Sequence, residues 1–319
     1  MTGPVPSTAA YDEVVFDSGG VDLHGWHFTG AGDTLDAGRG RPVVVMAHGL
    51  GGTKDSGLAP FADGLAKAGL DVLAFDYRGF GASQGEPRQR VSLAGQLADY
   101  RAAMAAAASL PGVDRRRLVL WGVSLAGGHV LAAGAHRDDV AAVVSLTPLV
   151  DGMAAARLAL KHHAPSSIAR STMAGFRSRL ATVAGRGPVM MPLVGRPGEV
   201  AALSLPGHYE SYLAIAGPTW RNEVDASVGM EMGGHRPAKA AKHLECPLLV
   251  QIADFDRSAP PQASAKAASN GRAEVRHYPC DHFDVWPGAD WFEPALAHQV
   301  SFLTRHLRPR SDAREMTGQ

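Results

Sequence analysis

Short apolar runs alternate with longer amphipathic segments along most of this 319-residue chain. Runs that are apolar throughout are typical of strands buried on both faces of a parallel sheet, and the segments between them are typical of crossover helices. We expect strands at 42–47, 70–75, 117–122, 140–146, 247–252 and 273–278. The pattern therefore predicts an α/β fold, with a mostly parallel central sheet flanked by helices.

Two segments depart from this alternation. Residues 11–16 and 21–28 flank a Ser-Gly-Gly turn, which predicts an antiparallel hairpin at one edge of the sheet. Residues 151–242 contain none of the expected core strands and are too many for a structureless loop. We expect them to form a mainly helical cap inserted between two parts of the core, residues 1–150 and 243–310. Residues 311–319 are expected to be a polar tail.

A serine stands where an expected strand meets an expected helix. Ser124 follows the apolar run 118–123 and is flanked by the small residues Gly122 and Ala126. This arrangement is typical of a nucleophile elbow, a tight turn that lifts the serine hydroxyl above the sheet edge. The usual pattern has glycine in place of Ala126, but the turn needs a small residue more than it needs glycine. Ser124 is the candidate nucleophile.

A serine nucleophile needs a histidine base and a carboxylate that orients the imidazole. In doubly wound hydrolases these residues follow one another in the order serine, acid, histidine. Asp254 and Asp256 follow the strand expected at 247–252, and His282 follows the strand expected at 273–278. The carboxyl ends of parallel strands share one sheet edge, so both aspartates are candidates to meet His282 there.

A glycine-rich turn at residues 48–52 comes directly after the strand expected at 42–47. Backbone N–H groups in such a turn can hold the oxyanion that forms when a nucleophile attacks a carbonyl. The predicted donors are the amides of Leu50 and Leu125, and His48 is expected to brace the turn. The turn matches neither the dinucleotide fingerprint nor the phosphate loop, so we expect no nucleotide site and no cofactor.

Together these segments resemble those of serine hydrolases with the α/β-hydrolase fold. The resemblance covers nearly all of the chain and is carried by residues 47–52, 75–83, 122–128, 254–256 and 282–283. It implies Ser124 as nucleophile, His282 as base and Asp256 as acid, because the family's acid stands shortly before a proline. The family commonly has Gly-Gly-His where this chain has Cys280, Asp281 and His282, so the histidine loop departs from the family pattern.

Methionine and aromatic residues recur in the expected cap, among them Met191, Tyr212 and Trp220. Such side chains over a catalytic serine suit an apolar substrate of moderate size, and they would equally pack the cap onto the core. We expect hydrolysis of a carboxylic ester or lactone through an acyl-enzyme. The alternatives are thioester, amide or carbon–carbon bond hydrolysis on the same fold, and a hydrolase-like protein that binds a ligand without turnover.

Charge and segment composition argue against several other classes of partner. Lys+Arg and Asp+Glu each number 31, so no long-range field attracts nucleic acid or an anionic membrane. The first residues lack the basic and apolar regions of a secretory signal, and no run of 18 apolar residues is present. A cytoplasmic protein with a small-molecule substrate is expected, and homo-oligomerisation is compatible with the sequence.

Neither the cysteines nor the adjacent histidines indicate a metal site. Cys246 and Cys280 are too few for a disulfide framework or a zinc cluster, and the sequence leaves their proximity open. His162 and His163 would point in different directions from a helix. We therefore expect no metal ligands.

Overall fold

A computed structural model describes residues 10–309, and the tail expected at 311–319 lies outside this range. One sheet contains eight strands in the order β1-β2-β4-β3-β5-β6-β9-β10. The strands are β1 (Asp12–Asp17), β2 (Asp22–Phe28), β3 (Arg41–Ala47), β4 (Asp71–Phe75), β5 (Val113–Val123), β6 (Val140–Leu146), β9 (Leu248–Ala253) and β10 (Glu274–Tyr278). β1, β2 and β4 pair antiparallel, and all pairs from β4 to β10 are parallel. The predicted sheet and edge hairpin are both present.

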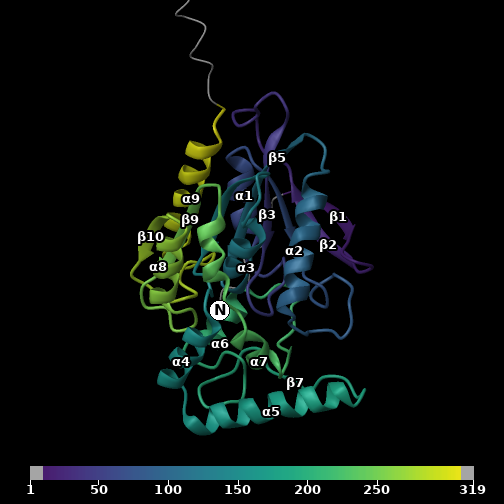
Figure 1. Ribbon diagram of the computed structural model, residues 1–319, viewed down its shortest axis with the longest axis vertical. Coiled ribbons are helices and arrows are strands. Elements are labelled where there is room, and N and C mark those ends of the chain that lie inside the picture. The colour runs from purple at the N-terminus through teal and green to yellow at the C-terminus, as the bar shows by residue number, and fades with distance from the viewer. Residues whose placement is uncertain (1–9, 310–319) are drawn as a thin grey trace, which may run out of the picture.

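Helices cover both faces of the sheet (Figure 1). The core helices are α1 (Ala59–Lys67), α2 (Leu93–Ala107), α3 (Leu125–Gly134), α8 (Pro261–Asn270) and α9 (Phe292–Leu307). The Trp121 side chain of β5 meets Phe61 of α1 and donates to Gln299 of α9. The neighbouring Leu120 side chain lies toward Gly134 of α3. Successive side chains of a strand point to opposite faces, so α1 and α9 lie opposite α3.

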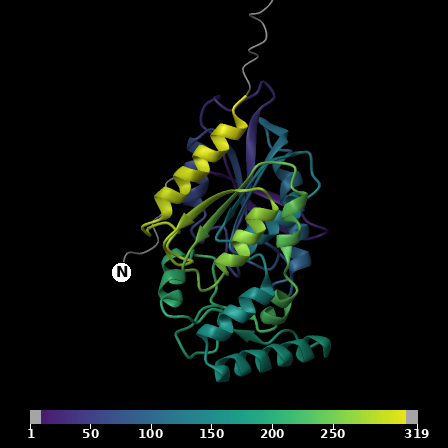
Figure 2. The same ribbon diagram turned by 60° about the vertical axis from the view of Figure 1, so that its left-hand side comes forward.

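The chain between β6 and β9 forms a separate group of elements, which we call the insert (residues 151–243). It contains α4 (Gly152–His162), α5 (Pro165–Val183), β7 (Met190–Met191), α6 (His208–Ile215), β8 (Val224–Asp225), α7 (Val228–Gly233), η1 (Pro237–Lys239) and η2 (Ala241–His243). Figures 1 and 2 show the insert gathered at one end of the sheet, with α5 outermost. None of the helices within residues 10–309 has both the length and the hydrophobicity needed to cross a lipid bilayer.

The two cysteines lie at opposite ends of neighbouring strands. Cys246 precedes β9, Cys280 follows β10, and these two strands pair in parallel. A strand of six residues extends about 20 Å, so the thiols are well separated. Both cysteines are free.

Candidate active site

Ser124 occupies the turn between β5 and α3 in a strained backbone conformation. Its φ is 56° and its ψ is −115°, outside the regions that non-glycine residues normally adopt. A methyl group at Gly122 would lie 2.2 Å from the Ala126 carbonyl oxygen, so the turn closes only because glycine stands there. Ala126 is fully buried at the third small position of the elbow. The tight turn therefore depends on small residues on both sides of Ser124.

His282 lies between Ser124 and Asp256. Its Nε2 is 3.1 Å from Ser124 Oγ, and its Nδ1 is 2.6 Å from Asp256 Oδ2. A carboxylate only accepts hydrogen bonds, so Nδ1 carries the proton and Nε2 is left to accept the serine proton. The other Asp256 oxygen accepts from the amides of Ser258 and Ala259, at 2.7 and 2.6 Å. The structure thus brings together three residues that lie on three different loops.

The other candidate acid, Asp254, contacts a different histidine. Asp254 Oδ1 is 2.7 Å from Nδ1 of His277, at an exposed position. Asp256, by contrast, is buried with His282. Of the two aspartates that the sequence left open, only Asp256 is placed against the imidazole.

The surroundings of His282 favour its protonated form more than water does. Burial is the largest single influence and lowers the pKa, but the Asp256 charge, its hydrogen bond and the Asp281 charge together raise the pKa of His282 above 6.5. Asp281 also accepts from the His282 amide, and Arg257 Nε donates to it at 2.6 Å. Where the family pattern has glycine, this chain therefore has a carboxylate that holds the histidine loop.

The glycine-rich turn approaches Ser124 closely. A methyl group at Gly49 would lie 2.9 Å from the Ser124 Cβ atom. Within the described part of the chain, neither the Leu50 amide nor the Leu125 amide donates to a protein oxygen. Leu125 opens α3, where helix amides are free and the helix dipole is positive. Both amides therefore remain free to donate to a bound group, as the predicted role requires.

His48 is packed inside the fold, as a bracing residue would be. Its Nδ1 lies 2.9 Å from the Gly49 carbonyl, and its ring makes edge contacts with Tyr77 and Phe80. Burial lowers the pKa of His48 below its usual value, which favours the neutral imidazole. A neutral ring bonded to the backbone stabilises the turn without adding charge to the site.

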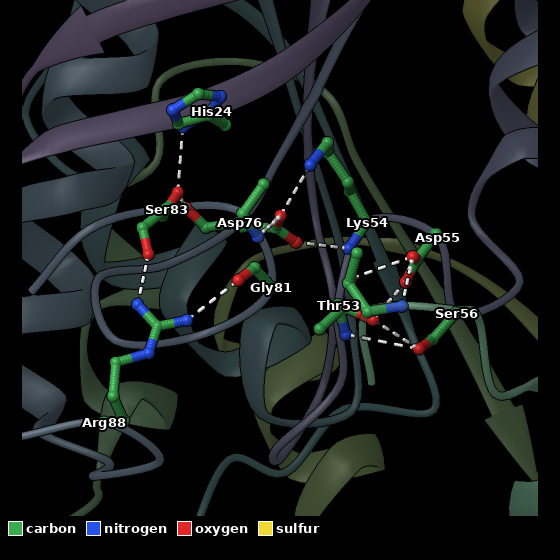
Figure 3. A network of polar contacts seen from close by, with 11 residues as sticks. His24, Thr53, Lys54, Asp55, Ser56, Asp76, Gly81, Ser83 and Arg88 are labelled. Atoms are coloured by element: carbon green, nitrogen blue, oxygen red, sulfur yellow. Dashed lines mark hydrogen bonds and ion pairs between the residues drawn. The ribbon is translucent and has the colours of Figure 1, made fainter. Parts of the chain in front are cut away.

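A buried ion pair ties the glycine-rich turn to the end of β4 (Figure 3). Lys54 Nζ donates to Asp76 Oδ2 at 2.6 Å, and the Lys54 amide donates to Oδ1 at 2.6 Å. The Lys54 ammonium also lies 5.1 Å from the ring centre of Trp26 in β2. Asp76 thus pairs with a residue 22 positions earlier in the chain. The only sequence signal for this pair was that Lys54 and Asp76 both lie in segments that follow buried strands.

The loop after Asp76 is held by further polar contacts, also drawn in Figure 3. Ser83 Oγ donates to the Asp76 carbonyl at 2.7 Å and accepts from the His24 amide at 2.8 Å. Arg88 donates to the carbonyls of Gly81 and Ser83. A methyl group at Gly81 would lie 2.2 Å from an Asp76 carboxylate oxygen, so glycine is required beside the ion pair. This loop fixes Asp76 from the side opposite to Lys54.

The insert holds the glycine-rich turn from its other side. The Tyr212 hydroxyl donates to the Leu50 carbonyl at 2.9 Å, and the Trp220 ring stacks on Tyr212 with centroids 5.2 Å apart. Asp55 accepts from both the amide and the hydroxyl of Thr219, at 2.9 and 2.8 Å. The sequence singled out Tyr212 and Trp220 as substrate contacts, but it gave no sign of these bonds to the turn.

Two cavities lie at the site. The first, of about 30 Å³, adjoins Ser124 and His282 and is lined from the insert by Leu203, Tyr212 and Ile215. The second, of about 490 Å³, lies among α4, α5 and α7, and Met191 lines it. Leu50 lines both cavities, whereas Trp220 lines neither. The first has room for one or two water molecules, and the second falls within the size range of small-molecule pockets.

Potential metal ligands are scattered rather than clustered. Among residues 10–309 no group of three or more His, Cys, Asp or Glu side chains is arranged to hold a metal ion. His163, one of the two adjacent histidines, lines the larger cavity instead.

Comparison with known proteins identifies the family to which the chain belongs. The family model described as alpha/beta hydrolase fold matches residues 42–289. The chain is 36% identical over 267 residues to the quorum-quenching protein AidA of Acinetobacter baumannii, covering 83% of this chain and 86% of that protein. It is 32% identical over 157 residues to the thiohydrolase aneE of Aspergillus aculeatus, about half of each chain (49%).

A solved structure shows the same architecture. The alpha/beta hydrolase GrgF from Penicillium superposes with a TM-score of 0.74 at 23% identity, covering 93% of this chain and 99% of that chain. The superposition and the family match confirm the predicted fold class. The chain therefore belongs to the α/β-hydrolase family.

Proposed function

We propose that this protein is a serine hydrolase that cleaves a carboxylic ester or lactone of a moderately sized apolar molecule. The observation that carries the proposal is the line of contacts from Ser124 Oγ through His282 to Asp256, at 3.1 and 2.6 Å. The similarity to a protein named for quorum quenching supports a small molecule as substrate.

The reaction proceeds through an acyl-enzyme. Ser124 Oγ attacks the carbonyl carbon while its proton passes to Nε2 of His282, and Asp256 stabilises the resulting imidazolium. The amides of Leu50 and Leu125 donate to the oxyanion of the tetrahedral intermediate. The intermediate expels the alcohol, which takes the proton from His282. Water then attacks the acyl group by the same steps and releases the acid.

We further propose that the insert acts as a cap. The small cavity at Ser124 has space for the reacting groups alone, so the rest of a substrate must lie elsewhere. The larger cavity is lined mainly by insert residues and shares Leu50 with the first. An apolar chain of moderate length would be bound there, with Met191 among its contacts.

Labelling with a fluorophosphonate tests the nucleophile. The reagent should modify Ser124, and mass spectrometry of the peptides locates the adduct. Ser124→Ala should abolish labelling and lower kcat for a short chromogenic ester by about 10⁶-fold. Ser301→Ala, which changes an exposed serine of α9, serves as the matched control and should label as wild type does. An unlabelled folded protein, or an adduct on another residue, would refute the proposal.

A second candidate function is cleavage of a thioester. The relative named thiohydrolase favours it, and the same acyl-enzyme would form. Esters, lactones and thioesters with the same acyl group, in graded chain lengths, separate the two functions by their kcat/KM values. The ester or lactone should be preferred if the main proposal is right, and a preference for the thioester at every chain length would replace it.

A further inference from the structure

The outward face of α5 is apolar and exposed. Met173, Phe176, Leu180 and Val183 are 61, 54, 70 and 82% exposed. Their spacing of three and four residues places them on one side of the helix. Soluble proteins rarely leave several large apolar side chains together in water without a partner for them.

Basic residues border this apolar stripe. At 100° per residue, Arg170 and Arg177 fall on one side of it and Arg179 on the other. Residues 152–186 contain no Asp or Glu, and their lysines and arginines are Arg157, Lys161, Arg170, Arg177, Arg179 and Arg186. Within the range that the structure describes, none of these six forms an ion pair. The chain as a whole has no net charge, but the surface formed by residues 152–186 is basic.

The position of α5 leaves this face open. Figures 1 and 2 both show the helix lying across the end of the molecule, outside the other elements of the insert. Its inner side, with Ile168, Ser171 and Gly175, lines the cavity of about 490 Å³. The helix thus stands between that cavity and the molecular surface.

We infer that the outward face of α5 docks on the surface of an anionic lipid bilayer. Met173, Phe176, Leu180 and Val183 would enter the boundary between headgroups and acyl chains, as in helices that lie in the membrane interface. The flanking arginines would extend to the lipid phosphates. This inference goes beyond the proposed hydrolysis, because docking needs neither Ser124 nor His282.

Charge decides between a bilayer and a second copy of this chain. A symmetric dimer through α5 would bring together two helices that carry arginines and no acidic residue, and like charges across an interface oppose association. An anionic bilayer offers both an apolar layer and a dense row of negative charges. It complements the whole face rather than its apolar stripe alone.

Flotation with vesicles tests the inference on the full chain carrying Ser124→Ala, which removes any hydrolysis of lipid. We expect binding to vesicles of equal parts phosphatidylcholine and phosphatidylglycerol, and much weaker binding to phosphatidylcholine alone. Added salt should weaken the binding. Wild type should float as Ser124→Ala does, so failure of the proposed hydrolysis would not alter the result.

Two double variants separate the apolar and basic contributions. Phe176→Ser with Leu180→Ser should lower partitioning by about a hundredfold or more, because two large apolar side chains then no longer enter the bilayer. Arg177→Gln with Arg179→Gln should lower partitioning on anionic vesicles by about 30-fold. Each arginine near an anionic surface contributes about fivefold to binding, and the two contributions multiply.

Matched controls change exposed residues of the core sheet instead of α5. Arg115→Gln with Arg116→Gln removes two exposed arginines of β5, and Val15→Ser removes an exposed valine of β1. Both should bind as the parent does, and circular dichroism should show unchanged helix content in all variants. The inference is overturned if the parent binds no vesicles or if the α5 variants float as well as the controls. It is also overturned if light scattering shows a dimer that only the Phe176→Ser, Leu180→Ser variant dissociates.

Discussion

The Tyr212 hydroxyl donates a 2.9 Å hydrogen bond to the carbonyl oxygen of Leu50. Tyr212 belongs to α6 in the insert, and Leu50 belongs to the core turn whose amide is proposed to hold the oxyanion. The insert therefore contacts the backbone of the proposed oxyanion site and not only the space for substrate.

Removing this hydrogen bond should slow the chemical step. Tyr212→Phe keeps the ring that stacks on Trp220 but loses the donor, so the turn is held less firmly. We expect kcat to fall by up to about tenfold, the value of one neutral hydrogen bond, with a smaller change in KM. Steady-state kinetics on a short ester measures both constants. Tyr209→Phe, on the same helix, is the control, and an unchanged kcat in Tyr212→Phe would show that the bond is dispensable.

Substitution of two neighbouring aspartates tests which of them is the catalytic acid. Asp256→Asn removes the charge that orients His282, and kcat should fall by about 10⁴-fold. Asp254→Asn alters only the contact with His277 and should keep nearly full activity. Comparable losses in the two variants would contradict the assignment of Asp256.

The acid limb of the pH profile should reflect the raised pKa of His282. The base must be neutral to accept the serine proton, so activity is lost as pH falls through this pKa. Because that pKa lies above 6.5, the loss should begin at a higher pH than for an unperturbed histidine.

Asp281→Asn tests the cause of this shift. It removes one of the charges that raise the pKa, so the acid limb of kcat/KM should move to lower pH. Asp290→Asn, at an exposed position of the following loop, should leave the limb in place. A limb that moves to higher pH in Asp281→Asn would mean that Asp281 acts on His282 by another route.

The buried ion pair between Lys54 and Asp76 predicts a stability effect. Asp76→Asn leaves the Lys54 ammonium buried without a counter-charge, so the free energy of unfolding should fall by about 3–5 kcal/mol. Adding Lys54→Met should recover part of this loss, because the unpaired charge is then gone. Urea denaturation followed by circular dichroism provides the measurement.

An exposed ion pair supplies the comparison. Asp63 and Lys67 lie one turn apart on α1, and Asp63→Asn should cost at most about 0.5 kcal/mol. Equal losses in Asp76→Asn and Asp63→Asn would show that burial does not set the cost of breaking the core pair.

Local sequence signals were sufficient for the main elements of the fold. The apolar run expected at 140–146 became β6 with the same bounds, and the strand expected at 42–47 became β3 with one more residue. The small residues around Ser124 indicated a tight turn, and Gly122 is indeed a position where no larger side chain fits. A buried strand and a tight turn each depend on the types of a few consecutive residues, so the sequence predicts them directly.

Contacts between segments that are far apart in the chain could hardly be predicted from the sequence. Tyr212 was singled out for its aromatic ring, yet its hydroxyl bonds to a carbonyl 162 positions away. Met191 was expected to contact the substrate, and it lines the larger cavity beside α5 rather than the small cavity at Ser124. These outcomes depend on how the insert folds back onto the core, and residue type alone does not encode that path.

The sequence by itself determined the buried strands, the elbow at Ser124 and the order of serine, acid and histidine along the chain. Burial, turn geometry and chain order are local properties that apolar runs, small residues and spacing express directly. The family resemblance implied Asp256 as the acid, but only the tertiary structure placed Asp256 rather than Asp254 against His282 and paired Lys54 with Asp76. It also left the apolar face of α5 open to solvent. Such pairings are fixed by strand order and loop conformation, because side chains far apart in sequence meet only when the whole sheet and the insert have formed.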